Sequence, residues 1–394
     1  MYYIMLLHLK VVVGLVTATL AAAESAGNFS IPLTRRQDPA QIGEDQIATF
    51  SGDFSHAVIK YSTALENYFR NTGKQHPLQA LQLSKRGSEG SVGLRNVDNG
   101  LLWTGQVQFG FPPQSVYVDF DTGSADMLVN HGAYNPGLSI SSHNTKKSFS
   151  STYSDGRKAN GTIYTDDFSI GGIKGKHVAV GLSKKEFIAS RESPNKGISG
   201  LSMPSIQTFP SSYKPFFQTL REQGAVSQGI FQFTIKTGSG SSLHLGGIDS
   251  SKYTGSITWV DFDPSDGFYV ASASINGKDI RTIIDSGTSL IIGPPNEVKE
   301  VLKSIDGVTI SDQNGQVMAT FPCKENPKVN IKYGSKTFPL ANAHLKQNST
   351  TCVLPIMGRS GLPMKAWIMG DPFFQSATVI FDQDKHRLGF AKQA

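Results

Sequence analysis

The sequence has few cysteines, few charges and no long apolar stretch. Only two of its 394 residues are cysteines, and only 17% are charged. No apolar run approaches the ~20 residues that a membrane-spanning helix needs, so we expect no membrane anchor. The formal net charge of +6 is scattered, without a basic stripe or interleaved aromatic residues. This pattern argues against nucleic-acid binding.

Glycine, serine and threonine are abundant instead. The 40 glycines and many hydroxyl-bearing residues separate short apolar runs, a composition typical of a secreted β-rich protein. A chain of 394 residues is too long for one compact core, so two lobes fit its length. We expect an all-β fold with a few short helices, of which residues 213–223 and 295–305 are the clearest.

The N-terminal region predicts two processing segments. Residues 1–23 combine a weakly basic start and an apolar stretch with small residues at the end, as a secretory signal peptide does; a buried strand or helix is the alternative. Residues 24–86 contain a helix-like patch at residues 57–69 and end at Lys85-Arg86, before a flexible Gly/Ser stretch. That dibasic pair indicates removal of a propeptide by a kexin-type processing protease; a solvated surface pair is the alternative.

Two short motifs carry the chemistry, one in each half of the chain. Both read Asp-hydroxyl-Gly-hydroxyl after an apolar, β-forming run: Asp121-Thr122-Gly123-Ser124 and Asp285-Ser286-Gly287-Thr288. One such turn is common, but a second copy indicates two related lobes that bring Asp121 and Asp285 together. An apolar strand that ends in glycine follows each motif at a similar distance, at Gly200 and Gly370. Two facing carboxylates can perform acid–base chemistry.

These residues resemble the pepsin-like aspartic endopeptidases. The resemblance covers essentially all of residues 101–394 and includes the strings LGGID at 245–249 and WIMGD at 367–371. It implies a bilobal pepsin-like fold with the active-site cleft between an N-terminal lobe, residues 87–254, and a C-terminal lobe, residues 255–394. The dibasic junction suggests a fungal secreted member of the family.

The resemblance also assigns roles to the motif residues. Asp121 and Asp285 would share a proton and activate a water molecule that attacks the scissile carbonyl. The other motif residues would support them. Gly123 and Gly287 would permit the tight turns, and the hydroxyls of Ser124 and Thr288 would hold the carboxyls coplanar. Thr122 and Ser286 would bond across to the opposite loop. Turn capping is the alternative for any single hydroxyl.

The implied activity is that of a secreted endopeptidase that cuts peptide bonds at acidic pH, with bulky apolar residues around the cut. It would act as a monomer on proteins and peptides without metal or other cofactor, and would start as a zymogen inhibited by residues 24–86. Because this segment has nearly balanced charge, cleavage at Lys85-Arg86 is expected rather than a strongly cationic clamp released by acid alone. A vacuolar location is the alternative to secretion, and a catalytically weak peptide-binding protein is the alternative to an active enzyme. A glycosidase is not expected, because glycosidases do not need the duplicated turns.

A hairpin that covers the substrate is expected after the first motif. The string YSDGR at residues 153–157 resembles the family's flap. Tyr153 would therefore close over bound peptide, and Asp155 would help to accept Lys before the cut bond; a strand tyrosine and a turn aspartate are the alternatives. The sequence departs from the family here, because Ser154 replaces the usual Gly and Leu128 replaces the usual Trp partner of the tyrosine.

Two kinds of modification are also expected. Cys323 and Cys352 should pair in an oxidising compartment, and they look like the family's C-lobe disulfide; two buried thiols are the alternative. Sequons at Asn28, Asn160 and Asn348 permit glycosylation of a secreted chain.

Overall fold

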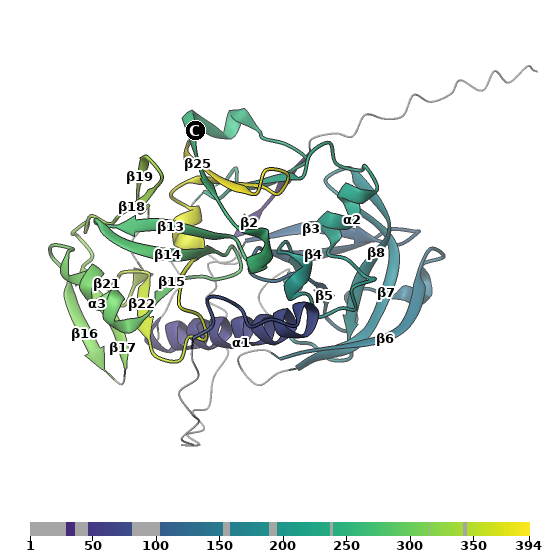
Figure 1. Ribbon diagram of the computed structural model, residues 1–394, viewed down its shortest axis with the longest axis horizontal. Coiled ribbons are helices and arrows are strands. Elements are labelled where there is room, and N and C mark those ends of the chain that lie inside the picture. The colour runs from purple at the N-terminus through teal and green to yellow at the C-terminus, as the bar shows by residue number, and fades with distance from the viewer. Residues whose placement is uncertain are drawn as a thin grey trace, which may run out of the picture.

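A computed structural model describes residues 29–35, 46–80, 103–152, 158–188, 195–236, 239–313, 315–341 and 345–394. These residues form three β-sheets with four α-helices and several short 3₁₀ turns (Figure 1). The predicted strand-rich, bilobal pepsin-like fold is confirmed. No helix within the described ranges is long and apolar enough to cross a membrane.

One sheet belongs mainly to the first half of the chain. It has eight strands, in the order β2 (Thr34–Arg35), β3 (Trp103–Phe109), β4 (Gln114–Asp121), β9 (Asn195–Gly200), β5 (Met127–Val129), β8 (Ile173–Ser183), β7 (Lys158–Ile170) and β6 (His143–Thr152). The long β6–β7 hairpin leads into and out of residues 153–157, where the flap is predicted; Tyr153, Ser154 and Asp155 lie outside the described residues.

A second sheet belongs to the second half. Its path is β19 (Lys336–Pro339), β18 (Asn330–Tyr333), β13 (Val270–Ile275), β14 (Lys278–Ile284), β23 (Trp367–Met369), β15 (Ile291–Gly293), β22 (Ile356–Arg359), β17 (Gln316–Pro322), β21 (Thr351–Val353) and β20 (Leu345–Lys346), with β16 (Thr309–Gln313) paired to β17. The two sheets lie on opposite sides of the molecule (Figure 1).

A third sheet of six strands joins the halves. Its order is β1 (Phe29–Pro32), β11 (Ser242–Leu245), β10 (Ile230–Thr234), β24 (Thr378–Asp382), β25 (Arg387–Gln393) and β12 (Tyr253–Asp261). The pairing of β10 with β24 links strands far apart in sequence. The stacked rings of Phe231 and Phe381, 4.7 Å between centroids, fill the core at this junction.

The helices are few, as predicted. The expected helices at residues 213–223 and 295–305 are present as α2 (Phe216–Glu222) and α3 (Pro295–Lys303), and α4 (Asp371–Phe374) is a single turn. The helix-like patch at residues 57–69 is the middle of a much longer helix, α1 (Gln46–Thr72), which ends where Gly73 adopts φ +71°.

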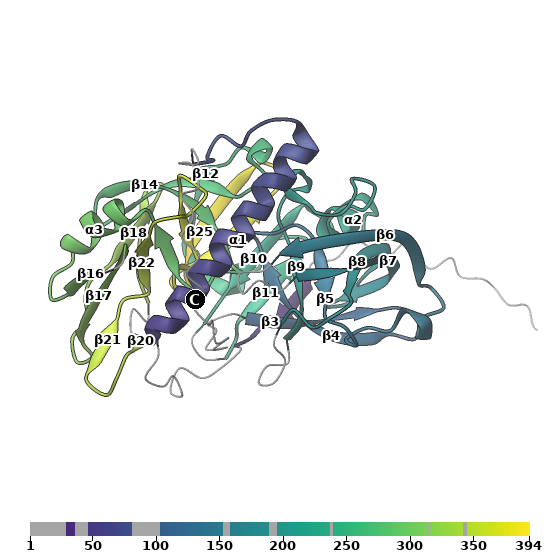
Figure 2. The ribbon, with the colours of Figure 1, turned by 90° about the horizontal axis from the view of Figure 1, so that it is seen from below.

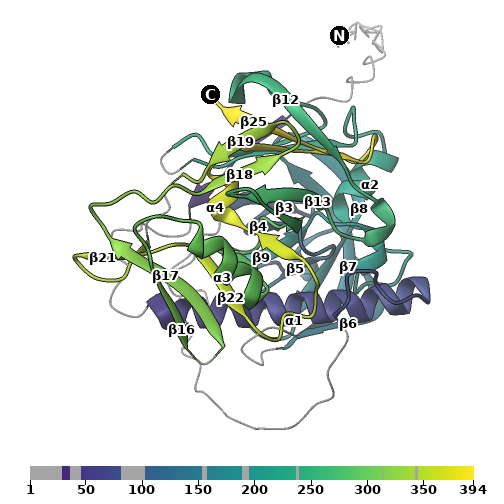
Figure 3. The same cartoon turned by 60° about the vertical axis from the view of Figure 1, so that its left-hand side comes forward.

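Helix α1 crosses the molecule from one half to the other (Figure 2). Its apolar residues recur at helical spacing and are buried: Phe54, Ala57, Tyr61, Ala64, Leu65 and Tyr68. Figure 3 shows the helix below the body of the molecule, between α3 and β6. Packing of this buried face, rather than intrinsic propensity, explains why the segment is held as one continuous helix.

Candidate active site

The two motifs stand at equivalent places in the two large sheets. Asp121 is the last residue of β4, and Asp285 directly follows β14. Each strand pairs in parallel with the glycine strand predicted from the repeat: Asp121 lies opposite Gly200 of β9, and Ile284 lies opposite Met369 of β23. The duplicated sequence pattern therefore folds into a duplicated structure.

The glycines of these strands allow the turn to lie directly on the neighbouring backbone. A Cβ on Gly200 would lie 2.4 Å from the carbonyl carbon of Ala125, and one on Gly370 would lie 2.0 Å from the carbonyl oxygen of Thr288. Any side chain at these positions would push the Asp-bearing loops out of place.

Two hydroxyl residues lock the loops together. Thr122 Oγ1 donates to the carbonyl of Ile284 at 2.9 Å, and Ser286 Oγ donates to the carbonyl of Phe120 at 2.6 Å. Each hydroxyl also accepts the backbone N–H of the other residue, at 3.1 and 3.0 Å. Since all of these groups are buried, the network fixes the separation of the two aspartates.

The motif glycines keep the space between the carboxylates open. A Cβ on Gly123 would lie 2.6 Å from Asp285 Oδ1, and a Cβ on Gly287 would lie 2.2 Å from Asp121 Oδ1. Each carboxylate therefore sits against the backbone of the opposite loop.

The carboxylates accept hydrogen bonds from their own loops. Gly123 N–H donates to Asp121 Oδ1 at 2.8 Å, and Gly287 N–H donates to Asp285 Oδ1 at 3.0 Å. Thr288 Oγ1 donates to Asp285 Oδ2 at 2.7 Å. The equivalent Ser124 hydroxyl is buried and has no hydrogen bond of normal geometry within the described residues.

A lysine from α1 lies between the two aspartates. Lys60 Nζ is 3.1 Å from Asp121 Oδ1 and 2.6 Å from Asp285 Oδ2, and it also donates to Thr288 Oγ1 at 3.3 Å. The next residue, Tyr61, donates its hydroxyl to Asp285 Oδ2 at 2.9 Å. Residues 24–86 thus contact the dyad itself.

These contacts make the two carboxyls unequal. Burial disfavours the ionised form of both, and Lys60 favours it. At Asp121, burial together with the charge of Asp285 prevails and raises the pKa. At Asp285, the charge and hydrogen bond of Lys60, together with hydrogen bonds from Asp121 and Thr288, prevail over burial and lower the pKa. The same pair of carboxylates holds the pKa of Lys60 well above its usual range despite its burial.

Helix α1 is anchored on both halves of the protein. In its first half, Phe54 packs under the guanidinium of Arg359, 5.2 Å from the ring centroid. In its last turns, Asn67, Arg70 and Asn71 donate to the backbone carbonyls of residues 205–208. The helix therefore closes the space above Asp121 and Asp285 from one half of the protein to the other.

The contacts of Lys60 and Tyr61 were not predicted from the sequence. The positive and negative charges of residues 24–86 nearly cancel, and a near-zero total conceals one positioned cation. One local feature of the sequence indicates a buried lysine: Lys60 stands within a run of apolar residues that a helix would bury.

The remaining predicted residues fall into two groups. Leu128 is buried against Phe149 and Phe209 below the hairpin, and Asn160 and Asn348 are exposed. The other predicted positions lie outside the described residues: Tyr153, Asp155, Asn28, Lys85, Arg86 and residues 1–23.

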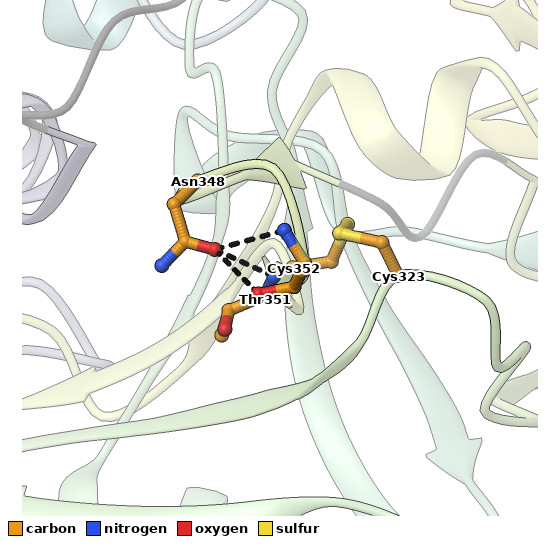
Figure 4. The surroundings of a disulfide bond; sticks show 5 residues. Cys323, Asn348, Thr351 and Cys352 are labelled. Atoms are coloured by element: carbon orange, nitrogen blue, oxygen red, sulfur yellow. Dashed lines mark hydrogen bonds between the residues drawn. A yellow bond between two sulfur atoms is a disulfide. The ribbon is translucent and has the colours of Figure 1, made fainter.

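The predicted disulfide is confirmed. Cys323 and Cys352 are joined by a bond of 2.06 Å in the C-terminal half. Figure 4 shows Asn348 in the adjoining turn, where its side-chain oxygen accepts the N–H groups of Thr350 and Thr351.

Comparison with known proteins agrees with this geometry. The family model described as eukaryotic aspartyl protease matches residues 102–393. The chain is 42% identical to secreted aspartyl protease 1 of Malassezia globosa, over 98% of this chain and 99% of that protein. It is 32% identical to pepsin A of Suncus murinus over 74% and 80% of the two chains, and 30% identical to aspergillopepsin-1 of Aspergillus flavus over 98% of each. The chain belongs to the eukaryotic aspartyl protease family and is an aspartic endopeptidase.

Proposed function

We propose that Asp121 and Asp285 are the catalytic pair of this endopeptidase. The observation that carries the proposal is the position of Lys60 Nζ, within 3.1 Å of both carboxylates. One small polar group can therefore contact both aspartates at once. The lysine ammonium stands in for the water molecule that two carboxyls must hold between them to hydrolyse a peptide bond.

Removal of Lys60 leaves two buried carboxyls side by side. Two adjacent carboxyl groups cannot both ionise, because the like charges would repel each other, so the pair keeps one proton. The ionised carboxyl takes a proton from the bound water as it attacks the scissile carbonyl carbon. The protonated carboxyl donates to the carbonyl oxygen, and a proton then passes to the departing amine. Loop contacts from Thr122 and Ser286 keep the pair in place throughout.

Residues 24–86 make the chain a zymogen in this proposal. They block the dyad with Lys60 and Tyr61, and they leave after cleavage at Lys85-Arg86 by a kexin-type protease. The mature enzyme is then a monomer with lobes at residues 87–254 and 255–394. The enzyme is secreted, as the name of the Malassezia relative says of that protein; fractionation of cells would detect a vacuolar location instead. It prefers bulky apolar residues around the cut.

Asparagine variants test the catalytic pair. The full chain, matured in the secretory pathway, should digest haemoglobin or casein at pH 3–5, and a statine-type inhibitor should block it. Asp121→Asn and Asp285→Asn should each lose at least a hundredfold in kcat/KM, since acid–base assistance is worth roughly 10²–10⁴-fold. Asp312→Asn, at an exposed aspartate paired with Lys299, is the matched control and should retain activity. Wild-type rates in either dyad variant would refute the assignment.

The alternative of a catalytically weak peptide-binding protein is not favoured. Both aspartates, both motif glycines and the cross-bonded hydroxyls are present. A protein that only bound peptide would not need a cation held on its carboxylates until maturation.

A further inference from the structure

The segment that follows α1 is docked on the C-terminal half of the protein. Within residues 73–80, Leu78 and Ala80 exchange backbone hydrogen bonds with residues 363–365, at 2.7 and 2.8 Å. His76 lies at the start of this contact and is only 3% exposed. A buried histidine at the junction between a removable segment and the body of an enzyme is a candidate switch.

Both ring nitrogens of His76 are occupied. Nδ1 accepts the Leu78 N–H at 3.1 Å, so Nδ1 carries no proton. Nε2 therefore carries the ring proton and donates it to the backbone carbonyl of Asp266 at 2.5 Å. A second proton on the ring would put an N–H against the N–H of Leu78. The docked segment thus accommodates only the neutral imidazole.

The ring is also linked, through Phe268, to a residue that blocks the dyad. His76 packs edge-on against Phe268, with centroids 5.4 Å apart, and Phe268 packs against Tyr61 at 5.2 Å. Tyr61 in turn donates to Asp285. Movement of His76 would therefore remove a ring that packs on Phe268, the residue against which the inhibitory tyrosine packs.

Few charged groups face His76 in the part of the chain that the structure describes. The Asp266 carboxylate favours the protonated form of His76. The positive charge of Arg281, 3.6 Å from that carboxylate, disfavours the protonated form. The Tyr68 phenol ring packs on the other side, 4.8 Å from the imidazole. Burial outweighs the attraction of Asp266 and lowers the pKa of His76.

We propose that His76 is an acid-sensitive latch of the inhibitory segment. Protonation of its ring breaks the contact with Leu78, undocks residues 73–80 and loosens Tyr61 on Asp285. The proposal rests on the zymogen role of residues 24–86.

The direction of the pH effect follows from linkage. The docked state has the lower His76 pKa, so the undocked state binds more protons once the pH falls below about 6.5, the usual value for histidine. The docking equilibrium should weaken by up to about tenfold per pH unit from there down to the pKa of the docked ring. The upper end of this range, about 6.5, lies well above the usual pKa of carboxyl groups, about 4. Weakening of the latch would thus begin in milder acid than an ordinary carboxylate needs for its protonation.

Hydrogen exchange of the intact proenzyme tests the latch. Amide protection at Leu78 and Ala80, corrected for intrinsic rates, should be nearly constant from pH 8 to 7 and should fall by up to about fivefold between pH 6.5 and 5.5. In His76→Gln, whose side-chain amide can donate and accept but cannot titrate, protection should not change over this range. His131→Gln, at an exposed histidine, is the matched control and should behave as wild type.

Two results would overturn the proposal: wild-type protection that does not change down to pH 5.5, or an unaltered pH dependence in His76→Gln. If His76→Gln fails to dock even at pH 8, an NMR titration of the His76 ring in wild type decides. The ring should titrate together with the loss of protection, and titration without undocking contradicts the latch. Because exchange is measured without any activity, failure of the matured chain to cut peptides would refute the proposed function and leave the latch result intact.

Discussion

At the scale of single residues, the dyad is neutralised by one side chain. Lys60 is 18% exposed and binds two carboxylates that are 5% exposed or less. Buried charges are stable only when paired, and loss of one partner leaves the other uncompensated. The proenzyme therefore depends on Lys60 most strongly where both aspartates would otherwise be charged.

Lys60→Met should destabilise the folded protein at pH 7 and less at pH 2, below the pKa of an unfolded aspartate. The lysine contributes stability by lowering the pKa of Asp285. That contribution is present above the pKa of an unfolded aspartate, about 3.9, and is lost as the pH falls through the lower folded value. Breaking a buried pair typically costs about 3–5 kcal/mol. Urea unfolding of the intact proenzyme at both pH values measures the effect.

Lys74→Met provides the control for that measurement, because Lys74 is exposed in the same segment. It should change the unfolding free energy by less than about 0.5 kcal/mol at either pH. An equal loss in Lys60→Met at pH 7 and pH 2 would contradict the electrostatic explanation.

At the scale of elements, the loop after the first motif contains a second buried carboxyl. Asp126 accepts the backbone N–H groups of Thr208 and Phe209, at 2.6 and 3.0 Å. It thereby fixes residues 204–209, whose carbonyls receive the last turns of α1. Burial raises the pKa of Asp126 to about 6 even though these hydrogen bonds oppose the shift.

Asp126 should make the protein more stable as the pH falls from 7 to 4. Its folded pKa lies above the unfolded value, so the native state binds more protons in this range and the unfolding free energy rises on acidification. In Asp126→Asn this contribution is absent. Relative to the variant, wild type should gain on the order of 2 kcal/mol between pH 7 and 4. Asp312→Asn is the matched control, and parallel curves for wild type and Asp126→Asn would refute the assignment.

The elements that were predicted correctly have local signatures. The turns at Asp121 and Asp285, the glycines that follow them and helices α2 and α3 are each specified by a few neighbouring residues. The true length of α1 was not predicted, because its first turns have no strong apolar repeat. The contact of Lys60 with the dyad spans 61 and 225 residues of sequence, and no periodicity specifies which distant carboxylates a lysine will meet. The roles of Tyr153 and Asp155 remain predictions.

At the scale of the whole molecule, the N-terminal segment contributes strands to two of the three sheets and a helix that bridges the two halves. Strand β1 forms the edge of the six-stranded sheet, β2 forms the edge of the eight-stranded sheet, and α1 bridges the two halves. Ile31 and Leu33 of this segment are buried and lie next to Gly105, beside the ring of Phe120. Phe120 directly precedes Asp121, so the segment packs behind the strand that bears Asp121 and also contacts both aspartates through α1.

This arrangement predicts that the segment is needed for folding as well as for inhibition. Ile31→Asp places an unpaired charge in the core beside Phe120, which costs several kcal/mol, and should sharply reduce the yield of folded, secreted proenzyme. Ser30→Asp changes the neighbouring residue of the same strand, but its side chain is exposed, so its yield should match wild type. The comparison separates the two roles, because neither substitution touches Lys60, Tyr61 or the dyad. A normal yield of folded Ile31→Asp proenzyme would show that β1 only accompanies the inhibitory helix, and that the two large sheets fold without it.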